Sequence, residues 1–160
     1  MNPHKLKYHD MYWAMAYTSA SQSVAEVLKV GAVVVTETGL ISPGWNGMPA
    51  GMDNCCEDHK KPKIDVYTNL ERPSTKPHVI HAERNALDKM TNQGIATRNS
   101  VVFVTTSPCF ECAKALHNLG LKALVYDRFY KDISGIQFLN QFIPVMQRYE
   151  AIKYLHLFGR

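Results

Sequence analysis

Two short patterns in this 160-residue chain place metal-binding residue types beside a residue that could move protons. The first is His81-x-Glu83, and the second is Cys109-x-x-Cys112 preceded by Pro108. With seven His and four Cys in the chain, chance gives roughly 0.3 occurrences of His-x-Glu and roughly 0.005 of Pro-Cys-x-x-Cys. Their joint occurrence therefore indicates a shared chemical task.

These residue types and spacings suit a catalytic zinc site. Two cysteines three positions apart in the first turn of a helix point the same way, so both thiolates can bind one ion. His81 would supply a third ligand from a neighbouring helix, which leaves the fourth position for water. Bound zinc lowers the pKa of that water to about 7. Glu83 projects in another direction, and we expect it to move protons rather than bind the metal.

Two other interpretations of the cysteines stay open at this point. Cys109 and Cys112 could form a redox dithiol, although such a pair needs no His-Ala-Glu partner. A purely structural zinc could be completed by Cys55 or Cys56, which would close the open position and leave Glu83 without a task. We favour the catalytic site because it uses all of these residue types.

Together the two patterns resemble the signature of the zinc-dependent cytidine deaminase superfamily. The chain is most similar to the deoxycytidylate (dCMP) deaminases, and the similarity weakens beyond Tyr130. The fold that this resemblance implies is α/β, a three-layer α/β/α sandwich with a central mixed sheet of about five strands. The matching segments are Lys29 to Ala32, Gly44 to Gly51, His81 to Leu87 and Pro108 to Lys114.

The resemblance also implies a reaction and a set of site residues. Zinc hydroxide attacks C4 of cytosine, and Glu83 carries protons to N3 and to the departing amino group. The products are dUMP, which feeds thymidine nucleotide synthesis, and ammonia. One catalytic zinc per chain would be held by His81, Cys109 and Cys112. The implied substrate-binding residues are Asn46 on the deoxyribose, the backbone of Ala82 on the base carbonyl, Ser107, and Lys29 and Tyr130 near the 5′-phosphate.

Regulation and assembly are implied by the resemblance alone. Many dCMP deaminases are homo-oligomers, often hexamers, that are activated by dCTP and inhibited by dTTP with the help of Mg²⁺. The corresponding effector loop would contain Trp45 and Gly47. The implied location is the cytoplasm, or the host cytoplasm for a viral protein, and neither nucleic acid nor a membrane is an expected partner.

A second metal could bind near Cys55 and Cys56. Some members of the family use a cysteine of this loop in a structural zinc site, and His59 or His78 could help here. The matching cysteine before the first predicted strand is absent, because the chain has Ala25-Glu26-Val27 there. We therefore expect one zinc per chain.

Composition limits the class of protein. Hydrophobic residues make up 46% and charged residues 20% of the chain, which is ordinary for a globular protein, and the length suits one domain over residues 1–160. Eighteen Lys and Arg against fourteen Asp and Glu leave a charge of +4, which suits an anionic ligand. No apolar stretch approaches the ~18 residues that would span a membrane. The few cysteines favour thiol or metal chemistry in a reducing compartment.

Hydrophobic periodicity predicts the elements that position these residues. Strands and helices alternate in the middle of the chain, which indicates an α/β protein. Residues 47–77 are predicted as a long excursion without regular elements, and such excursions are usually functional. The predicted helices are Lys5–Leu28, Val79–Gly94, Pro108–Gly120 and one interrupted near Pro144. The predicted strands are Val30–Val35, one beginning at Leu40 and ending in the loop Pro43–Gly47, Val101–Val104, Leu121–Tyr126 and Ile152–Phe158.

Three other functions remain open at this level. In tRNA adenosine deaminases the segment between the Trp-Asn turn and the His-Ala-Glu helix is short, whereas Asn46 and His81 lie 35 positions apart here. Free-nucleoside cytidine deaminases lack the Gly-x-Asn-Gly-x-Pro loop in this form. A non-catalytic zinc protein that senses nucleotides would not need Glu83. The nucleotide deaminases are therefore favoured.

Overall fold

A mixed five-stranded sheet forms the centre of the computed structural model, which describes all residues, 1–160. Its strand order is β2-β1-β5-β6-β7. β1 pairs antiparallel with β2 and β5, whereas β5, β6 and β7 run parallel. The prediction of a mixed sheet of about five strands is confirmed. The strands are β1 (Gly31–Val35), β2 (Ile41–Trp45), β5 (Val101–Thr106), β6 (Ala123–Arg128) and β7 (Val145–Gln147).

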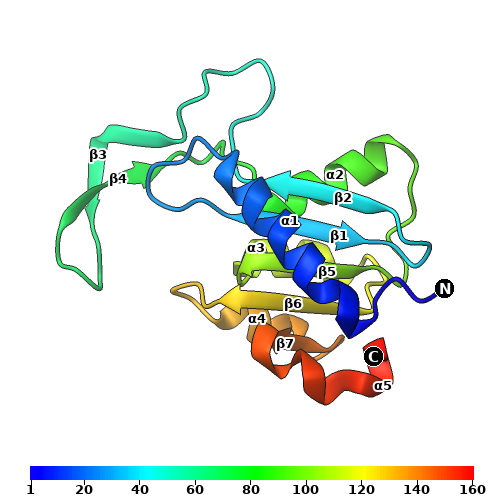
Figure 1. Ribbon diagram of the computed structural model, residues 1–160. Coiled ribbons are helices and arrows are strands. Elements are labelled where there is room, and N and C mark those ends of the chain that lie inside the picture. Colours follow the sequence, from blue (N-terminus) through cyan, green and yellow to red (C-terminus); the bar gives the residue numbers. More distant parts are fainter.

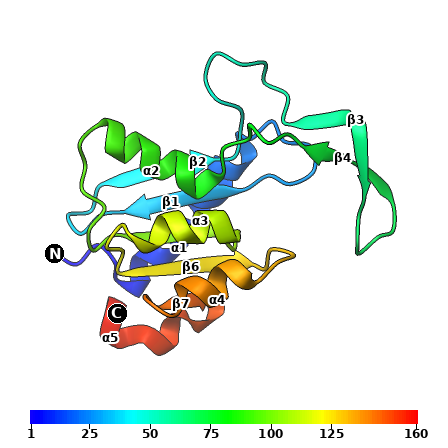
Figure 2. The same ribbon diagram turned by 180° about the vertical axis from the view of Figure 1, so that it is seen from behind.

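Helices cover both faces of this sheet, because alternate residues of a buried strand face opposite sides. Val33 and Val35 pack with α1, η2 and α5, whereas Ala32 and Val34 pack with α2, α3 and α4. Figure 1 shows α1 in front of the sheet, and Figure 2 shows α2 and α3 on the opposite face. The predicted α/β/α layers are confirmed. The helices are η1 (Leu6–Tyr8), α1 (His9–Ser21), α2 (Ala82–Asn92), α3 (Phe110–His117), α4 (Ser134–Leu139), η2 (Arg148–Tyr154) and α5 (Leu155–Phe158).

The first long helix ends at Ser21, not at the predicted Leu28. Ser23 explains the early end, because its hydroxyl donates to the carbonyl of Asn46 (2.8 Å) and accepts from the amide of Ala25 (3.2 Å). Such local serine hydrogen bonds compete with helix continuation. The chain from 22 to 30 is a loop instead, and Leu28 on this loop lines a cavity.

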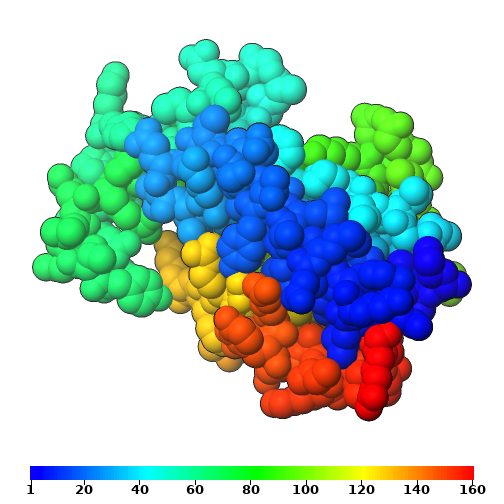
Figure 3. Space-filling view, viewed as in Figure 1, coloured from blue at the N-terminus to red at the C-terminus, as the bar shows by residue number.

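The segment predicted as an excursion contains a β-hairpin, so that prediction was wrong. Strands β3 (Glu57–Ile64) and β4 (Glu71–Thr75) pair antiparallel as a separate two-stranded sheet. Six of the eight β3 residues are exposed, so no alternation of apolar and polar residues marks the strand in the sequence. The hairpin stands away from the main body of the molecule (Figures 1 and 3).

The C-terminal end also differs from the prediction. The segment Ile152–Phe158, predicted as a strand, is helical in η2 and α5, and the three-residue strand β7 was not predicted. Ala151 and Phe158 are buried against the sheet, while Ile152 is 61% exposed. In a strand, Ile152 and Phe158 would lie on the same face, so this burial pattern does not fit a strand. No helix of the molecule has both the length and the apolar character to cross a membrane.

Candidate active site

The predicted zinc ligands lie where two helices begin beside the sheet. His81 immediately precedes α2, and Cys109 immediately precedes α3, which follows β5 through Ser107 and Pro108. Because β5 and β6 are parallel, their carboxyl ends meet at this edge, and ligands of open α/β sheets bind at such edges. The topology therefore brings residues from two distant segments together.

The donor atoms of His81, Cys109 and Cys112 form a compact group within 4.8 Å of one another. Nδ1 of His81 lies 3.5 Å from Sγ of Cys109 and 3.3 Å from Sγ of Cys112. Zinc bonds of about 2.3 Å to sulfur and 2.0–2.1 Å to nitrogen give a tetrahedral separation of roughly 3.5 Å. The three residues therefore fit one zinc ion, and His81 would bind through Nδ1.

Hydrogen bonds among these groups shift the pKa values of the two thiols in opposite directions. Hydrogen bonds from Cys112 and His81 lower the pKa of Cys109 to about 4. The hydrogen bond with Cys109 and burial raise the pKa of Cys112, and the bond with Cys109 also raises the pKa of His81. One thiolate is thus favoured without metal, and binding of zinc would displace the remaining protons.

Glu83 lies in the first turn of α2 and is 3% exposed. Burial raises the pKa of its carboxyl, against smaller opposing effects that include His81 and Cys112. It lines the same cavity as His81 and Cys109 but does not join the three donor atoms. A buried carboxyl beside the metal ligands can hold and release a proton there.

Close packing at two glycines fixes the starts of both helices. A Cβ on Gly44 of β2 would collide with the carbonyl of Ala82, and a Cβ on Gly135 of α4 would collide with the carbonyl of Pro108. The loop after β2 is also held by Gly47, which exchanges two backbone hydrogen bonds with Ile80 (3.1 and 2.9 Å). These contacts position His81 and Cys109 from outside the helices themselves.

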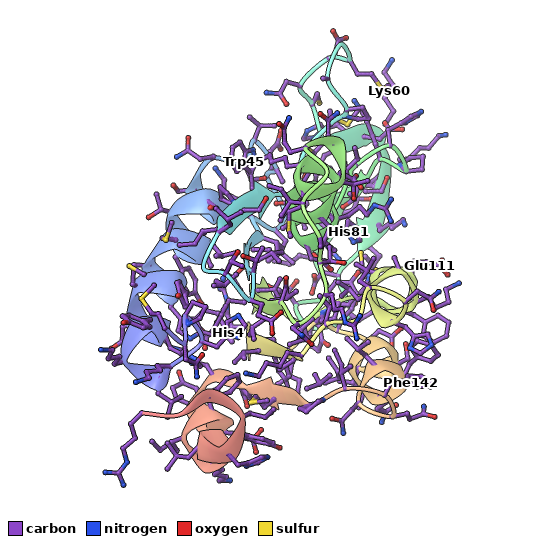
Figure 4. All side chains as sticks on the ribbon, turned by 90° about the vertical axis from the view of Figure 1, so that its right-hand side faces the viewer. His4, Trp45, Lys60, His81, Glu111 and Phe142 are labelled. Atoms are coloured by element: carbon purple, nitrogen blue, oxygen red, sulfur yellow. The ribbon has the colours of Figure 1, made fainter.

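A cavity beside the predicted zinc ligands brings together four of the predicted substrate-binding residues. Asn46, Ala82, Ser107 and Tyr130 all line it. Figure 4 shows His81 in the interior of the molecule and Lys60 far from it on the hairpin. The remaining lining residues are Leu28, Val30, Glu57, Thr75, Val79, His81, Glu83, Thr106 and Cys109.

The side chains of Asn46 and Ser107 form hydrogen bonds to backbone groups of the protein. Asn46 Oδ1 accepts from the amide of Val30 (2.8 Å), and its Nδ2 donates to the carbonyl of Leu28 (2.8 Å). Ser107 Oγ accepts from the amide of Tyr130 (2.8 Å). Both side chains therefore shape the wall of the cavity, whatever else they bind.

Three predicted residues lie outside this cavity. Lys29 is exposed and lines neither this cavity nor its mouth. Trp45 is held by Asn85, whose Nδ2 donates to the Trp45 carbonyl (2.6 Å), and by Lys89, whose Nζ lies 4.5 Å from the ring centroid. Gly47 lies on the same loop and also lines neither. Their predicted roles stay predictions.

A basic mouth adjoins the cavity, and the sequence did not reveal it. The two spaces share Leu28, Thr75, Thr106 and Tyr130. The mouth contains three cationic side chains, one on the hairpin, one at the end of β6 and one in the loop after β6, with two acidic ones. The only sequence signal was a net positive charge. The charged residues are Arg72, Arg128, Lys131, Glu26 and Asp65.

The candidates for a second metal site do not come together. Cys55 is exposed and its thiol donates to the carbonyl of Glu57 (3.4 Å), while Cys56 is fully buried. His59 pairs instead with the exposed carboxylate of Glu26 (3.2 Å). In the whole chain, only His81 and its two cysteine partners form a group of three or more metal-binding side chains.

Comparison with known proteins agrees with this geometry. The model of the cytidine and deoxycytidylate deaminase zinc-binding region matches residues 6–128. The deoxycytidylate deaminase of Enterobacteria phage T4 is 32% identical over 145 residues, covering 72% of this chain and 75% of that protein. The human deoxycytidylate deaminase is 32% identical over 154 residues, covering 87% and 82%. The crystal structure of dCMP deaminase from cyanophage S-TIM5 in complex with dCMP and dUMP is 35% identical, with a TM-score of 0.78, covering 89% and 98%.

Proposed function

This chain belongs to the cytidine and deoxycytidylate deaminase family, and on that premise we propose that it hydrolyses dCMP to dUMP and ammonia. The observation that carries the proposal is the group of His81, Cys109 and Cys112 at one end of a cavity that Glu83 also lines. A redox dithiol would not need His81 at 3.3–3.5 Å from both sulfurs. The similarity to dCMP deaminases favours this substrate over a nucleoside or tRNA.

The zinc, when bound, supplies a nucleophile at neutral pH by lowering the pKa of water to about 7. The chain's own residues then do the rest. Glu83, buried at the cavity, would carry the two protons of the attacking water in turn, the first to N3 of the cytosine and the second to the amino group that departs as ammonia. Ala82 lies at the start of α2, where backbone N–H groups have no partner within the helix, and its N–H donates to the base carbonyl. These contacts hold C4 beside the metal ligands.

The basic mouth supports a nucleotide as the substrate. Arg72, Arg128 and Lys131 lie where the cavity opens, so a 5′-phosphate would meet positive charge while the base reaches His81. Arginine binds phosphate oxygens through charge-assisted hydrogen bonds. Tyr130 lines both spaces and would contact the phosphate from the wall between them.

The same resemblance extends the proposal to assembly and regulation. We infer one zinc per chain, a cytoplasmic location, a homo-oligomer, and dCTP and dTTP as effectors that bind with Mg²⁺ near Trp45.

Large apolar side chains on and beside the hairpin turn support an oligomer, since soluble monomers rarely gather them at the surface. The solution mass tests the assembly, because a value of 18.1 kDa, the mass of one chain, would contradict it. These side chains are Ile64, Val66, Tyr67 and Leu70, which are 58–79% exposed.

Ammonia release tests the activity directly. We would assay the zinc-loaded protein in parallel with dCMP, dCTP, cytidine and a tRNA anticodon stem-loop. The proposal predicts turnover of dCMP at a higher kcat/KM than of the other three. Preferred turnover of cytidine or of the tRNA would replace it with one of the other deaminase activities, and binding without turnover of any would indicate a nucleotide sensor.

A further inference from the structure

Glu57 lines the cavity and carries a buried carboxylate oxygen that has no hydrogen-bond partner. The residue is 2% exposed at the start of β3 and lines the cavity that holds His81. Its Oε1 accepts hydrogen bonds from the amides of Glu26 (3.0 Å) and Val27 (3.3 Å). Its Oε2 is buried and has no hydrogen-bond partner. A buried polar atom left unpaired is costly, so this oxygen calls for a donor that the chain does not provide.

The position of Glu57 indicates which part of a nucleotide supplies that donor. Glu57 is the register partner of Thr75, and Thr75 lines both the cavity and the basic mouth. Glu57 therefore lies between the zinc ligands at one end and Arg72 at the other. In a nucleotide the sugar lies between the base and the phosphate. With the base at His81 and the phosphate at the mouth, the sugar falls beside Glu57.

We propose that Glu57 Oε2 accepts a hydrogen bond from the 3′-hydroxyl of the substrate deoxyribose. This inference rests on the proposed function. In dCMP the 1′ carbon carries the base and the 5′ oxygen the phosphate, so the 3′-hydroxyl is the only free donor on the sugar. The two backbone amides on Oε1 hold the carboxylate in place before substrate arrives. Glu57 is thus a specificity-determining residue for the sugar.

A substrate that lacks this hydroxyl provides the test. The zinc-loaded protein would be assayed with dCMP and with 2′,3′-dideoxycytidine 5′-monophosphate. Because a hydrogen bond to a charged group contributes roughly 10- to 150-fold, we expect wild type to prefer dCMP in kcat/KM by about that factor. Glu57→Gln keeps an oxygen for the amides of Glu26 and Val27 but removes the negative charge, so it should lower kcat/KM for dCMP at least ~10-fold while the dideoxy substrate changes little.

The controls separate recognition from a structural role. Glu71→Gln changes an exposed carboxylate on the same hairpin, in β4, and should preserve the preference for dCMP. An equal loss on both substrates in Glu57→Gln would show that Glu57 only supports the fold, and would overturn the inference. So would a wild-type protein that uses both substrates equally well, a result that does not depend on the variant folding. Failure of wild type to deaminate either substrate would instead contradict the proposed function.

Discussion

At the scale of single residues, Glu83 and Cys109 line one cavity but have different expected tasks. Glu83 lies outside the group of three donor atoms, so Glu83→Ala should leave the zinc content at about one per chain. It should lower kcat at least ~10²-fold, the low end for general acid–base catalysis. Cys109→Ala removes a ligand and should lose metal together with activity. Metal content by elemental analysis, measured beside ammonia release, distinguishes the two.

Loss of zinc from Glu83→Ala would contradict its role as a proton carrier. Full zinc occupancy in Cys109→Ala would show that the ligand set is wrong. Glu111→Ala is a suitable control, because Glu111 is an exposed residue of α3 that pairs with Lys114 (2.8 Å). It should change neither zinc content nor rate.

Arg72 and Lys29 provide a second comparison at this scale. Arg72 lines the basic mouth, where its Nε lies 3.1 Å from Asp65 Oδ2, whereas Lys29 is exposed outside it. A charge-assisted hydrogen bond to phosphate contributes about 1.5–3 kcal/mol, or roughly 10- to 150-fold. Arg72→Gln should therefore lower kcat/KM for dCMP by about that factor, with little effect on deoxycytidine, which has no phosphate.

Lys29→Gln is the matched change, because the family resemblance placed Lys29 near the same phosphate. The effect of Arg72→Gln on dCMP should exceed that of Lys29→Gln. If only Lys29→Gln lowers kcat/KM for dCMP without lowering it for deoxycytidine, then Lys29 binds the phosphate, as the family resemblance implies, and Arg72 does not. An equal loss on both substrates in Arg72→Gln would indicate that the Arg72 pair with Asp65 only stabilises the hairpin.

The residues that could be predicted from the sequence share a local spacing. His81 and Glu83, or Cys109 and Cys112, are close in the chain, so the geometry of one helical turn relates them. Glu57 and Arg72 have no such local pattern. Glu57 reaches the cavity, and Arg72 its mouth, only because the hairpin lies beside the loop at 22–30. No hydrophobic periodicity marks that hairpin. Polar residues that only the tertiary fold brings to the site leave no local pattern in the sequence, so they could not be predicted.

At the scale of elements, a pair of buried histidines fastens the start of α1 to the sheet. Nε2 of His4 donates to the carbonyl of Val35 (3.0 Å), and Nε2 of His9 donates to the carbonyl of His4 (2.9 Å). Both bonds need hydrogen on Nε2, so the neutral rings carry none on Nδ1. Burial lowers the pKa of both histidines below the usual 6.5.

Stability should therefore fall as the pH drops below about 6.5. The unfolded chain binds protons at these histidines in a range where the folded protein does not, and this favours unfolding. The contribution is fully present above pH 6.5 and is lost as the pH falls toward the lowered folded-state pKa. Urea midpoints at pH 7.5 and 5.5 measure the loss in the zinc-loaded protein.

His9→Gln keeps a donor for the His4 carbonyl but cannot titrate, so its midpoint should fall less between these pH values than that of wild type. His156→Gln, at an exposed position in α5, should behave like wild type. Since all three proteins share the same zinc ligands, release of metal at low pH cancels in the comparison. Identical pH dependence in His9→Gln and wild type would contradict the assignment.

The elements that could be predicted are those whose burial leaves a pattern. β1 and β5 are buried over their whole length and contain continuous apolar runs, and α2 buries one face at helical spacing. β3, β4 and β7 could not be predicted, because β3 and β4 are composed mostly of polar residues and β7 has only three residues. Their pairing depends on partners distant in the chain.

At the scale of the whole molecule, the predicted zinc ligands come from two helices, α2 and α3, that cover different strands on the same face of the sheet. His81 begins α2, which packs on β1 and β2, while Cys109 and Cys112 lie at the start of α3, which packs against α4. A bound ion would connect these two helices, so its binding free energy adds to the stability of the fold. A zinc-dependent unfolding temperature follows from this arrangement.

Removal of zinc should lower that temperature without a separate early transition, if residues 1–160 unfold as one domain. At free zinc 1,000 times the Kd, binding contributes about 4 kcal/mol, or roughly 8–16 °C in Tm for a chain of this size. Calorimetry before and after dialysis against a chelator measures the shift. The loaded protein should contain one zinc per chain, because Cys55 and Cys56 belong to no group of three metal-binding side chains. Two zinc ions in wild type, with one lost in Cys55→Ser, would contradict that count and place a second structural metal beside the hairpin.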